Sequence, residues 1–291
     1  MPFRRHLGER SRGGRIRAHR PPIVAGILLT PGPDLSALTI ATDSYTVEGG
    51  DFQGIAFSPD GLNMYIGDDA SNGVLHYTLT IPFDVTTRGT RDFTWEPVDP
   101  FGVQSNDPWI TPDGSRILLL SSDPDVVYWA DLSVAFDLST VGATSTEDIL
   151  GAPGAITSGG VGMCFNADGT AMFITDSVST RIIKSVLSTP YDPSTRAAPI
   201  TVLDMSIEQS GGGGFGIDFS GDGTKFYSAD LTTNFVHQYN TDVAYDLSVA
   251  SHRIGEKTAA GTNPYGLFCR KDANEIYVTH NNANRVISSW T

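Results

Sequence analysis

The sequence predicts an all-β protein, a five-bladed β-propeller whose N-terminal strand closes the last blade. Two short motifs recur in register along the chain at intervals of 50–55 residues. The last repeat lacks a fourth strand, and an unpaired strand stands before the first repeat. The 31 Gly and 17 Pro residues, with only 18% charged residues, are typical of a turn-rich β protein and exclude a helical bundle.

The first motif is a strand that ends in an Asp-Gly turn. Asp accepts hydrogen bonds from the amides of its own turn, and Gly accepts the positive φ that such turns need. The copies occupy residues 54–61, 107–114, 162–169 and 216–223, with a degenerate fifth copy at 266–273, and their turn aspartates are Asp60, Asp113, Asp168, Asp222 and Asp272.

The second motif is Phe or Tyr followed by Asp, in a loop about 24 residues after each turn. It occupies residues 82–87, 135–140, 190–195 and 244–249. Because both motifs keep the same spacing, the repeat is not a chance similarity. A repeat of about 50 residues with four strands is the blade of a β-propeller.

The elements follow from this repeat. Residues 1–35 are expected to form an extended Arg-rich arm, and residues 36–50 the closing strand. Blades start near residues 53, 106, 161, 215 and 265, and blade one has strands at 53–58, 63–67, 73–79 and 91–96. The fifth blade has three strands before Thr291, and an open edge would leave backbone donors unpaired. We therefore expect residues 37–47 to complete it.

Composition limits the function classes. The 291 residues, 40% of them hydrophobic, are enough for one large domain with a full core. A net charge of −14 argues against a protein that coats nucleic acid. Cys164 and Cys269 lie in non-adjacent blades, so we expect buried free thiols rather than a disulfide or a multi-cysteine metal site.

Residues 1–20 carry seven arginines and one glutamate, a charge of +6 that leaves −20 on the remainder. This arm is interpreted either as a disordered tail or as an anchor on an acidic neighbour, and we favour the anchor. Binding of nucleic acid is the weaker interpretation, because the acidic body would repel phosphates. The arginines are Arg4, Arg5, Arg10, Arg12, Arg15, Arg17 and Arg20.

The apolar run at residues 23–29 is too short to cross a bilayer, so no membrane span is expected. Because it follows arginines, a removed signal peptide is an alternative. The run is short and is interrupted by Pro31, so we expect that no leader is removed.

The repeat resembles two known groups. Its Phe-Ser-Pro-Asp-Gly turn at residues 57–61 resembles TolB-like and lactonase-like propellers. Its second motif, as in residues 76–87 and 186–195, is similar to a propeller repeat of proteins encoded by tailed, often marine, bacteriophages and by environmental bacteria. That family has Trp where this chain has Phe or Tyr. The resemblance covers residues 53–291 and implies the fold and a virion or tail-associated role without assigned chemistry.

Polar residues are expected at the channel mouth, where the second strand of each blade ends. Such a ring could bind calcium or supply an acid and a base to a sugar. Alternatively, each Asp binds the amides of its own loop, and recurrence in successive blades favours this structural interpretation. The candidates are Asp68, Ser121, Asp176, Asp230 and His280, with Gln53, Asn106 and Asp107 from the first strands.

The aromatic residues of the second motif are expected on the opposite face. They either stack on glycans or fill the gaps between blades, and their repetition favours packing. They are Phe83, Phe136, Tyr191 and Tyr245.

The leading hypothesis is a non-enzymatic structural virion protein of a tailed phage, without a cofactor. Residues 1–35 would bind other virion proteins, and host surface glycans are a further expected partner. One alternative is a secreted or periplasmic lactonase-like or glycosidase-like hydrolase with a divalent metal or carboxylates at the channel mouth. Another is a bacterial surface binding module.

Overall fold

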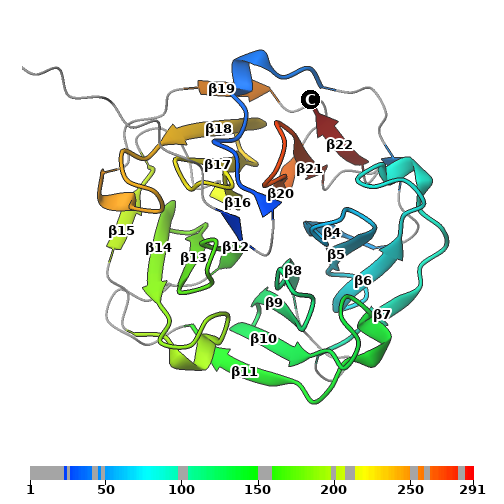
Figure 1. The fold of residues 1–291 in the computed structure, drawn as a ribbon. Coiled ribbons are helices and arrows are strands. Elements are labelled where there is room, and N and C mark those ends of the chain that lie inside the picture. The colour runs from blue at the N-terminus through cyan, green and yellow to red at the C-terminus, as the bar shows by residue number, and fades with distance from the viewer. Residues whose placement is uncertain are drawn as a thin grey trace, which may run out of the picture.

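The computed structural model confirms the five-bladed propeller. It describes residues 23–24, 27–40, 45–46, 50–97, 104–149, 159–197, 201–206, 214–249, 255–258, 263–280 and 286–291. Five antiparallel four-stranded sheets stand around a common centre (Figure 1). The innermost strands of neighbouring blades contact one another in cyclic order, so the ring is closed.

Each of the first four blades is a continuous stretch of chain, with strands ordered from the centre outward. Blade one contains β4 (Phe52–Phe57), β5 (Asn63–Asp68), β6 (Gly73–Thr78) and β7 (Phe93–Trp95). Blade two contains β8 (Ser105–Ile110), β9 (Arg116–Ser122), β10 (Asp125–Asp131) and β11 (Ser145–Asp148). Blade three contains β12 (Gly160–Phe165), β13 (Ala171–Asp176), β14 (Arg181–Val186) and β15 (Thr201–Asp204). Blade four contains β16 (Gly214–Phe219), β17 (Lys225–Asp230), β18 (Phe235–Asn240) and β19 (Gly255–Thr258).

Blade five joins both ends of the described chain, as expected. It contains β20 (Pro264–Cys269), β21 (Ile276–His280), β22 (Val286–Trp290) and, as its outer strand, β3 (Tyr45–Thr46). Val286 pairs with Thr46, and Ile40 bridges to Trp290. Thr39 and Thr291 exchange two backbone hydrogen bonds, of 2.7 and 3.0 Å. The N-terminal strand therefore closes the ring.

The two sequence motifs form one structural device. The 3-10 helices η2 (Val85–Thr87), η3 (Leu138–Thr140), η4 (Pro193–Thr195) and η5 (Leu247–Val249) follow the aromatic residue of the second motif. In blade one, the ring of Phe83 covers Gly61, where an added Cβ would collide with it. The Phe83 amide donates to the Gly61 carbonyl at 2.9 Å. The same contact and bond recur in the pairs Phe136–Gly114, Tyr191–Gly169 and Tyr245–Gly223.

A fifth copy of this device lies at the N-terminal side of the ring. Asp34 caps the 3-10 helix η1 (Leu35–Ala37) with its carboxylate, as Asp84 caps η2. The carbonyl of Pro33 accepts from the Tyr227 hydroxyl, as the carbonyl of Phe83 accepts from that of Tyr277. Residues 33–37 thus supply the loop that blade five lacks.

The ring therefore extends further toward the N-terminus than the expected boundary at residue 36. Leu29 and Leu35 are buried, and Thr30 bonds to the turns of two blades. Its amide donates to the Lys271 carbonyl at 2.9 Å, and its carbonyl accepts from Asp222 at 3.0 Å. Before it lies a hairpin of β1 (Ile23–Val24) and β2 (Ile27–Leu28).

The core is distributed between the blades rather than at the centre. In the described residues, the buried apolar side chains fall into five clusters, and each cluster lies between two adjacent blades. The cluster of blades four and five includes Leu35 and Leu38. Cys164 and Cys269 are buried free thiols in the inner strands, as expected. Each blade is therefore stabilised mainly by its neighbours.

Candidate functional site

The polar residues predicted at the ends of the second strands are built into the blades. Each member pairs in the sheet with the start of its own inner strand, for example Asp68 with Phe52 and His280 with Pro264. The members are at most 3% exposed: Asp68, Ser121, Asp176, Asp230 and His280. Gln53 is also buried, whereas Asn106 lies in β8 and its side chain is outside the described part of the structure.

The aspartates of this ring bind the amides of their own loops. Asp68 accepts from the Ser71 amide at 3.1 Å, and Asp176 accepts from that of Ser179 at 3.0 Å. Asp230 accepts from Thr232 and Thr233, at 2.9 and 3.1 Å. This is the hydrogen bonding that the structural interpretation of the ring expects.

Members of this ring also have partners besides the loop amides. Asp176 pairs with Arg181, and Asp230 lies 3.2 Å from Nε2 of His237. Burial alone would raise the pKa of Asp230, but hydrogen bonds from His237 and Thr233 hold it below its usual value. His280 bonds to the Ser288 hydroxyl at 2.8 Å. Within the described residues, no three His, Cys, Asp or Glu side chains are grouped as metal ligands.

The aromatic residues of the second motif are also structural in their contacts. Phe83 is 7% exposed, and its ring lies on Gly61 and near Phe57. The hydroxyls of Tyr191 and Tyr245 donate to backbone carbonyls of the adjacent turns, at 3.1 and 2.9 Å. These rings fill the space between turn and loop, as the packing interpretation expects.

A different group of residues breaks the repeat. Asp107 occupies a position that is Gly54 or Gly162 in neighbouring blades, and Asp218 one that is Ala56 or Phe268. Lys271 replaces the Pro59 of blade one. Sites that carry chemistry differ between repeats, whereas structural devices recur, so these three residues are the stronger candidates.

The two carboxylates each bridge adjacent blades. Asp107 accepts from the Met163 amide at 2.8 Å, and Asp218 accepts from that of Cys269 at 2.8 Å. Lys271 donates from Nζ to Asp218 at 2.6 Å and to the Phe219 carbonyl at 2.7 Å.

Burial changes the acidity of both groups. It raises the pKa of Asp107 well above its usual value, the bond from Met163 opposes this, and the charge of Asp218 adds to it. Burial also raises the pKa of Asp218, although the Lys271 ammonium acts in the opposite direction. Asp107 is therefore a neutral acid over a range of pH in which an exposed Asp is ionised.

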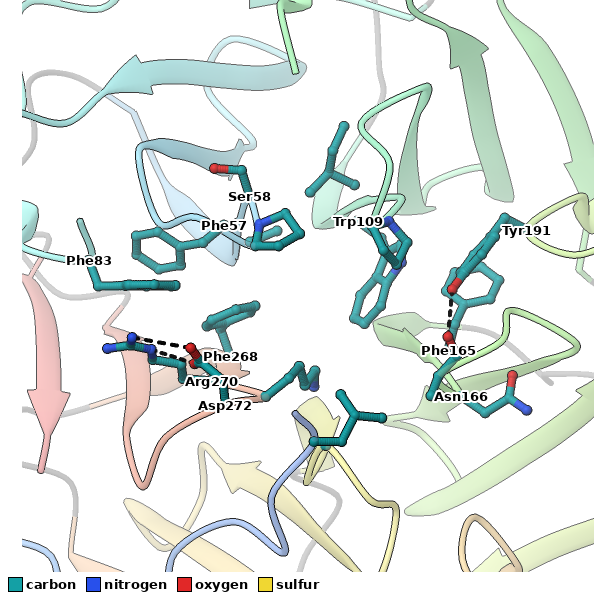
Figure 2. Close-up of a pocket in the computed structure, with 18 of the residues that line it drawn as sticks. Phe57, Ser58, Phe83, Trp109, Phe165, Asn166, Tyr191, Phe268, Arg270 and Asp272 are labelled. Carbon is teal, nitrogen blue, oxygen red and sulfur yellow. Dashed lines mark hydrogen bonds and ion pairs between the residues drawn. The ribbon is translucent and has the colours of Figure 1, made fainter. Parts of the chain in front are cut away.

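Beside this group, a pocket of about 90 Å³ opens among the turns between first and second strands. Figure 2 shows Phe57, Phe83 and Phe268 on one side of it and Trp109, Phe165 and Tyr191 on the other. The Lys271 ammonium lies 5.7 Å from the ring centres of both Trp109 and Phe268. The Trp109 indole N–H is buried without a hydrogen-bond partner. The pocket is thus lined mainly by aromatic rings, with Arg270, Lys271 and Asp272 also in its wall.

Sequence reasoning named Asp107 but missed Asp218, Lys271 and Trp109. The signal was present for Asp218 and Lys271, because each is a charged residue at a position that is uncharged in the other four blades. The seven arm arginines, Arg4, Arg5, Arg10, Arg12, Arg15, Arg17 and Arg20, lie outside the described residues. No helix among the described residues has the length and apolar character needed to cross a bilayer.

The comparisons with known proteins identify the fold. No protein-family model matches the chain, and no curated protein sequence matches it. The chain spans 68% and 66% of the first two solved structures that it matches.

Three solved structures illustrate the likeness. A luciferin-regenerating enzyme is 11% identical, with 88% of this chain and 95% of that chain covered and a TM-score of 0.53. A protein from Lactobacillus plantarum is 14% identical, with 84% and 77% covered and a TM-score of 0.52. The periplasmic gluconolactonase PpgL of Pseudomonas aeruginosa is 13% identical, with 80% and 67% covered and a TM-score of 0.45. At these identities the likeness concerns the fold alone: the chain is similar to known β-propellers, and the propeller part of the predicted resemblance is confirmed.

Proposed function

We propose that the protein is a non-enzymatic structural protein, a rigid propeller that serves in the particle of a tailed phage. The observation that carries the non-enzymatic part is the use of Asp68, Asp176 and Asp230. Their carboxylates are buried and bind the amides of their own loops, so the ring that a hydrolase would present to a substrate serves the blades instead. The phage setting is supported by the second motif, which is similar to a repeat of tailed-phage proteins.

The experiment that tests the setting is mass spectrometry of particles purified on a density gradient. We expect the chain at a constant ratio to the other particle proteins through successive gradients. A chain that separates from the particles and stays with soluble proteins would exclude the virion role.

A calcium titration of the purified full chain tests the ring. We expect that Asp176 and Asp230 do not hold a tightly bound calcium, so that Asp176→Asn and Asp230→Asn leave the titration unchanged. A single tightly bound calcium that is lost in these variants would overturn the structural role of the ring.

A second candidate, a hydrolase, is favoured by one observation. Asp107 is a buried acid with a raised pKa, and the nearby Asp218 is paired with Lys271 beside an aromatic pocket. Pairs of carboxyl groups in unlike surroundings are the usual acid and base of hydrolases. Hydrolysis of lactones or glycosides that is lost in both Asp107→Asn and Asp218→Asn would establish this function in place of the structural one.

A further inference from the structure

A second pocket lies between blades one and two and is acidic. Its volume is about 530 Å³, and its lining includes Asp60, Asn63, His76, Asp92 and Asp137. Neither lysine nor arginine is among the described residues that line it. Asp60 and Asp137 accept hydrogen bonds from amides of their own loops, and Asp92 accepts from the Thr78 amide at the end of β6. These bonds do not neutralise the negative charge.

At the other junctions between blades, a cationic side chain occupies the equivalent place. Between blades two and three, Arg116 donates to the Tyr191 carbonyl at 3.1 Å. Between blades three and four, Lys184 donates to the Tyr245 carbonyl at 2.7 Å. Between blades four and five, Lys225 donates to the Pro33 carbonyl at 3.2 Å.

The junction of blades five and one also has a cation beside this loop, but the cation contacts an aromatic ring instead of a carbonyl. The Arg270 guanidinium lies 4.0 Å from the centre of the Phe83 ring. Thus four junctions, among the residues that the structure describes, place a cation of the chain beside the loop of the second motif.

At the junction of blades one and two, the cations are replaced by neutral residues. Asn63 stands at the position of Arg116 and Lys225, and His76 at that of Lys184. The repeat-breaking Asp92 adds a further carboxylate. The site that holds a cation elsewhere is here an anionic pocket.

His76 gives a second indication of a missing donor. The Asn63 amide group donates to the Ser58 hydroxyl, which turns its Oδ1 toward Nε2 of His76 at 3.0 Å. An imidazole that donates from Nε2 to this oxygen has an acceptor at Nδ1. His76 is 5% exposed, and Nδ1 is buried without a partner. A group that donates hydrogen bonds and carries positive charge would suit the carboxylates, and His76 beside them leaves one ring nitrogen unpaired.

We propose that this pocket binds an arginine side chain from residues 1–20 of a second copy of the chain. The arm carries a charge of +6 and the remainder −20, so the two surfaces are complementary in charge. A guanidinium presents five donors to carboxylates and supplies the cation that Arg116 supplies at the next junction. This inference rests on the proposed anchoring role of the arm, and it names the partner as the chain itself.

The test is sedimentation velocity of the purified full chain over a range of concentrations, in low and in high salt. We expect association that weakens in high salt and is lost when the seven arm arginines are replaced by Gln. The double variant Asp92→Asn/Asp137→Asn should raise the dissociation constant about tenfold or more. Asp192→Asn is the matched control, because it removes the same cap from blade three outside the pocket, and it should associate like the unchanged chain.

Asn63→Arg keeps the proposal falsifiable if the Asp variants unfold. It gives blade one the cation that Arg116 supplies in blade two. The variant should therefore block association and should have the same thermal midpoint as the unchanged chain. Association of Asn63→Arg at the unchanged strength would overturn the proposal. The proposal would also be overturned if the chain stayed monomeric at every concentration, even if its arm bound its own pocket. Because this readout needs neither particles nor substrates, its failure is distinguishable from failure of the proposed function.

Discussion

At the scale of single residues, the repeated loop is stabilised in spite of unfavourable backbone angles. Phe83, Phe136, Tyr191 and Tyr245 have φ between +55° and +65°, a region that costs a bulky residue about 1–2 kcal/mol. In each case the amide bonds to the turn glycine, and the ring covers that glycine. The cost is therefore offset by a bond and a contact that require glycine at the turn.

This dependence on glycine leads to a prediction. Gly114 has φ +71°, and an added Cβ would overlap the ring of Phe136. We expect Gly114→Ala to lower the free energy of unfolding by about 2–4 kcal/mol, from strain and from displacement of the ring. Urea denaturation followed by circular dichroism measures it.

Gly89→Ala is the control for that substitution, because an added Cβ there meets no atom within 4 Å. It should change the free energy of unfolding by less than about 0.5 kcal/mol. Equal effects of the two substitutions would show that the ring of Phe136 and the turn glycine are not coupled.

Asp107 and Asp230 should respond to pH in opposite directions. Burial raises the pKa of Asp107 in the folded state, so its stability contribution is complete below the unfolded pKa, about 3.9, and is lost as pH rises toward the folded value. Asp107→Asn keeps an acceptor for Met163 and should therefore be more stable than the unchanged chain at pH 8 and equal to it at pH about 4. Urea midpoints across this range measure the difference.

Asp230 provides the contrast. Its folded pKa is lowered, so its contribution is present above the unfolded pKa and is lost as pH falls through the folded value. Asp230→Asn should be less stable than the unchanged chain at pH 8 and should approach it in acid. Parallel pH profiles for the two variants would show that these carboxyl groups do not titrate as their surroundings require.

At the scale of elements, repetition decided what could be predicted from the sequence. Blade boundaries, the Asp-Gly turns and the closing strand were predicted because each rests on a motif or on an unpaired edge. The fifth loop was missed because Pro33 stands where other copies have Phe or Tyr, and because the segment lies far from blade five in sequence. The group of Asp218 and Lys271 was not predicted because a repeat marks the residues that recur, whereas these two differ from their equivalents in the other blades.

The fifth loop gives a prediction at this scale. Asp34 accepts from the Ser36 amide at 3.0 Å, as Asp84 accepts from the Thr86 amide at 3.0 Å. If residues 33–37 are a true copy of the loop, Asp34→Ala and Asp84→Ala should each lower the free energy of unfolding by about 1 kcal/mol. Chemical denaturation of both variants compares them. If Asp84→Ala lowered the free energy of unfolding and Asp34→Ala left it unchanged, the N-terminal copy would be held by packing alone.

At the scale of the whole molecule, the ring has no independent blade. Every apolar cluster in the described residues is shared by two blades, and the N-terminal segment completes the cluster between blades four and five. Opening the junction of blades four and five therefore exposes faces on both sides of the gap. Cooperative unfolding of the entire ring is expected from such an arrangement.

Leu35→Ala tests this cooperativity. Leu35 is fully buried between blades four and five, so its truncation should cost about 2–5 kcal/mol of unfolding free energy. In a Trp290→Phe background, the remaining tryptophans lie only in blades one and two, at residues 95, 109 and 129. We expect their fluorescence and the far-ultraviolet circular dichroism to report one coincident transition at a lower urea midpoint, although the substitution lies across the ring. A transition seen by circular dichroism before the fluorescence changes would show that blade five opens alone and that closure stabilises only the blade in which it occurs.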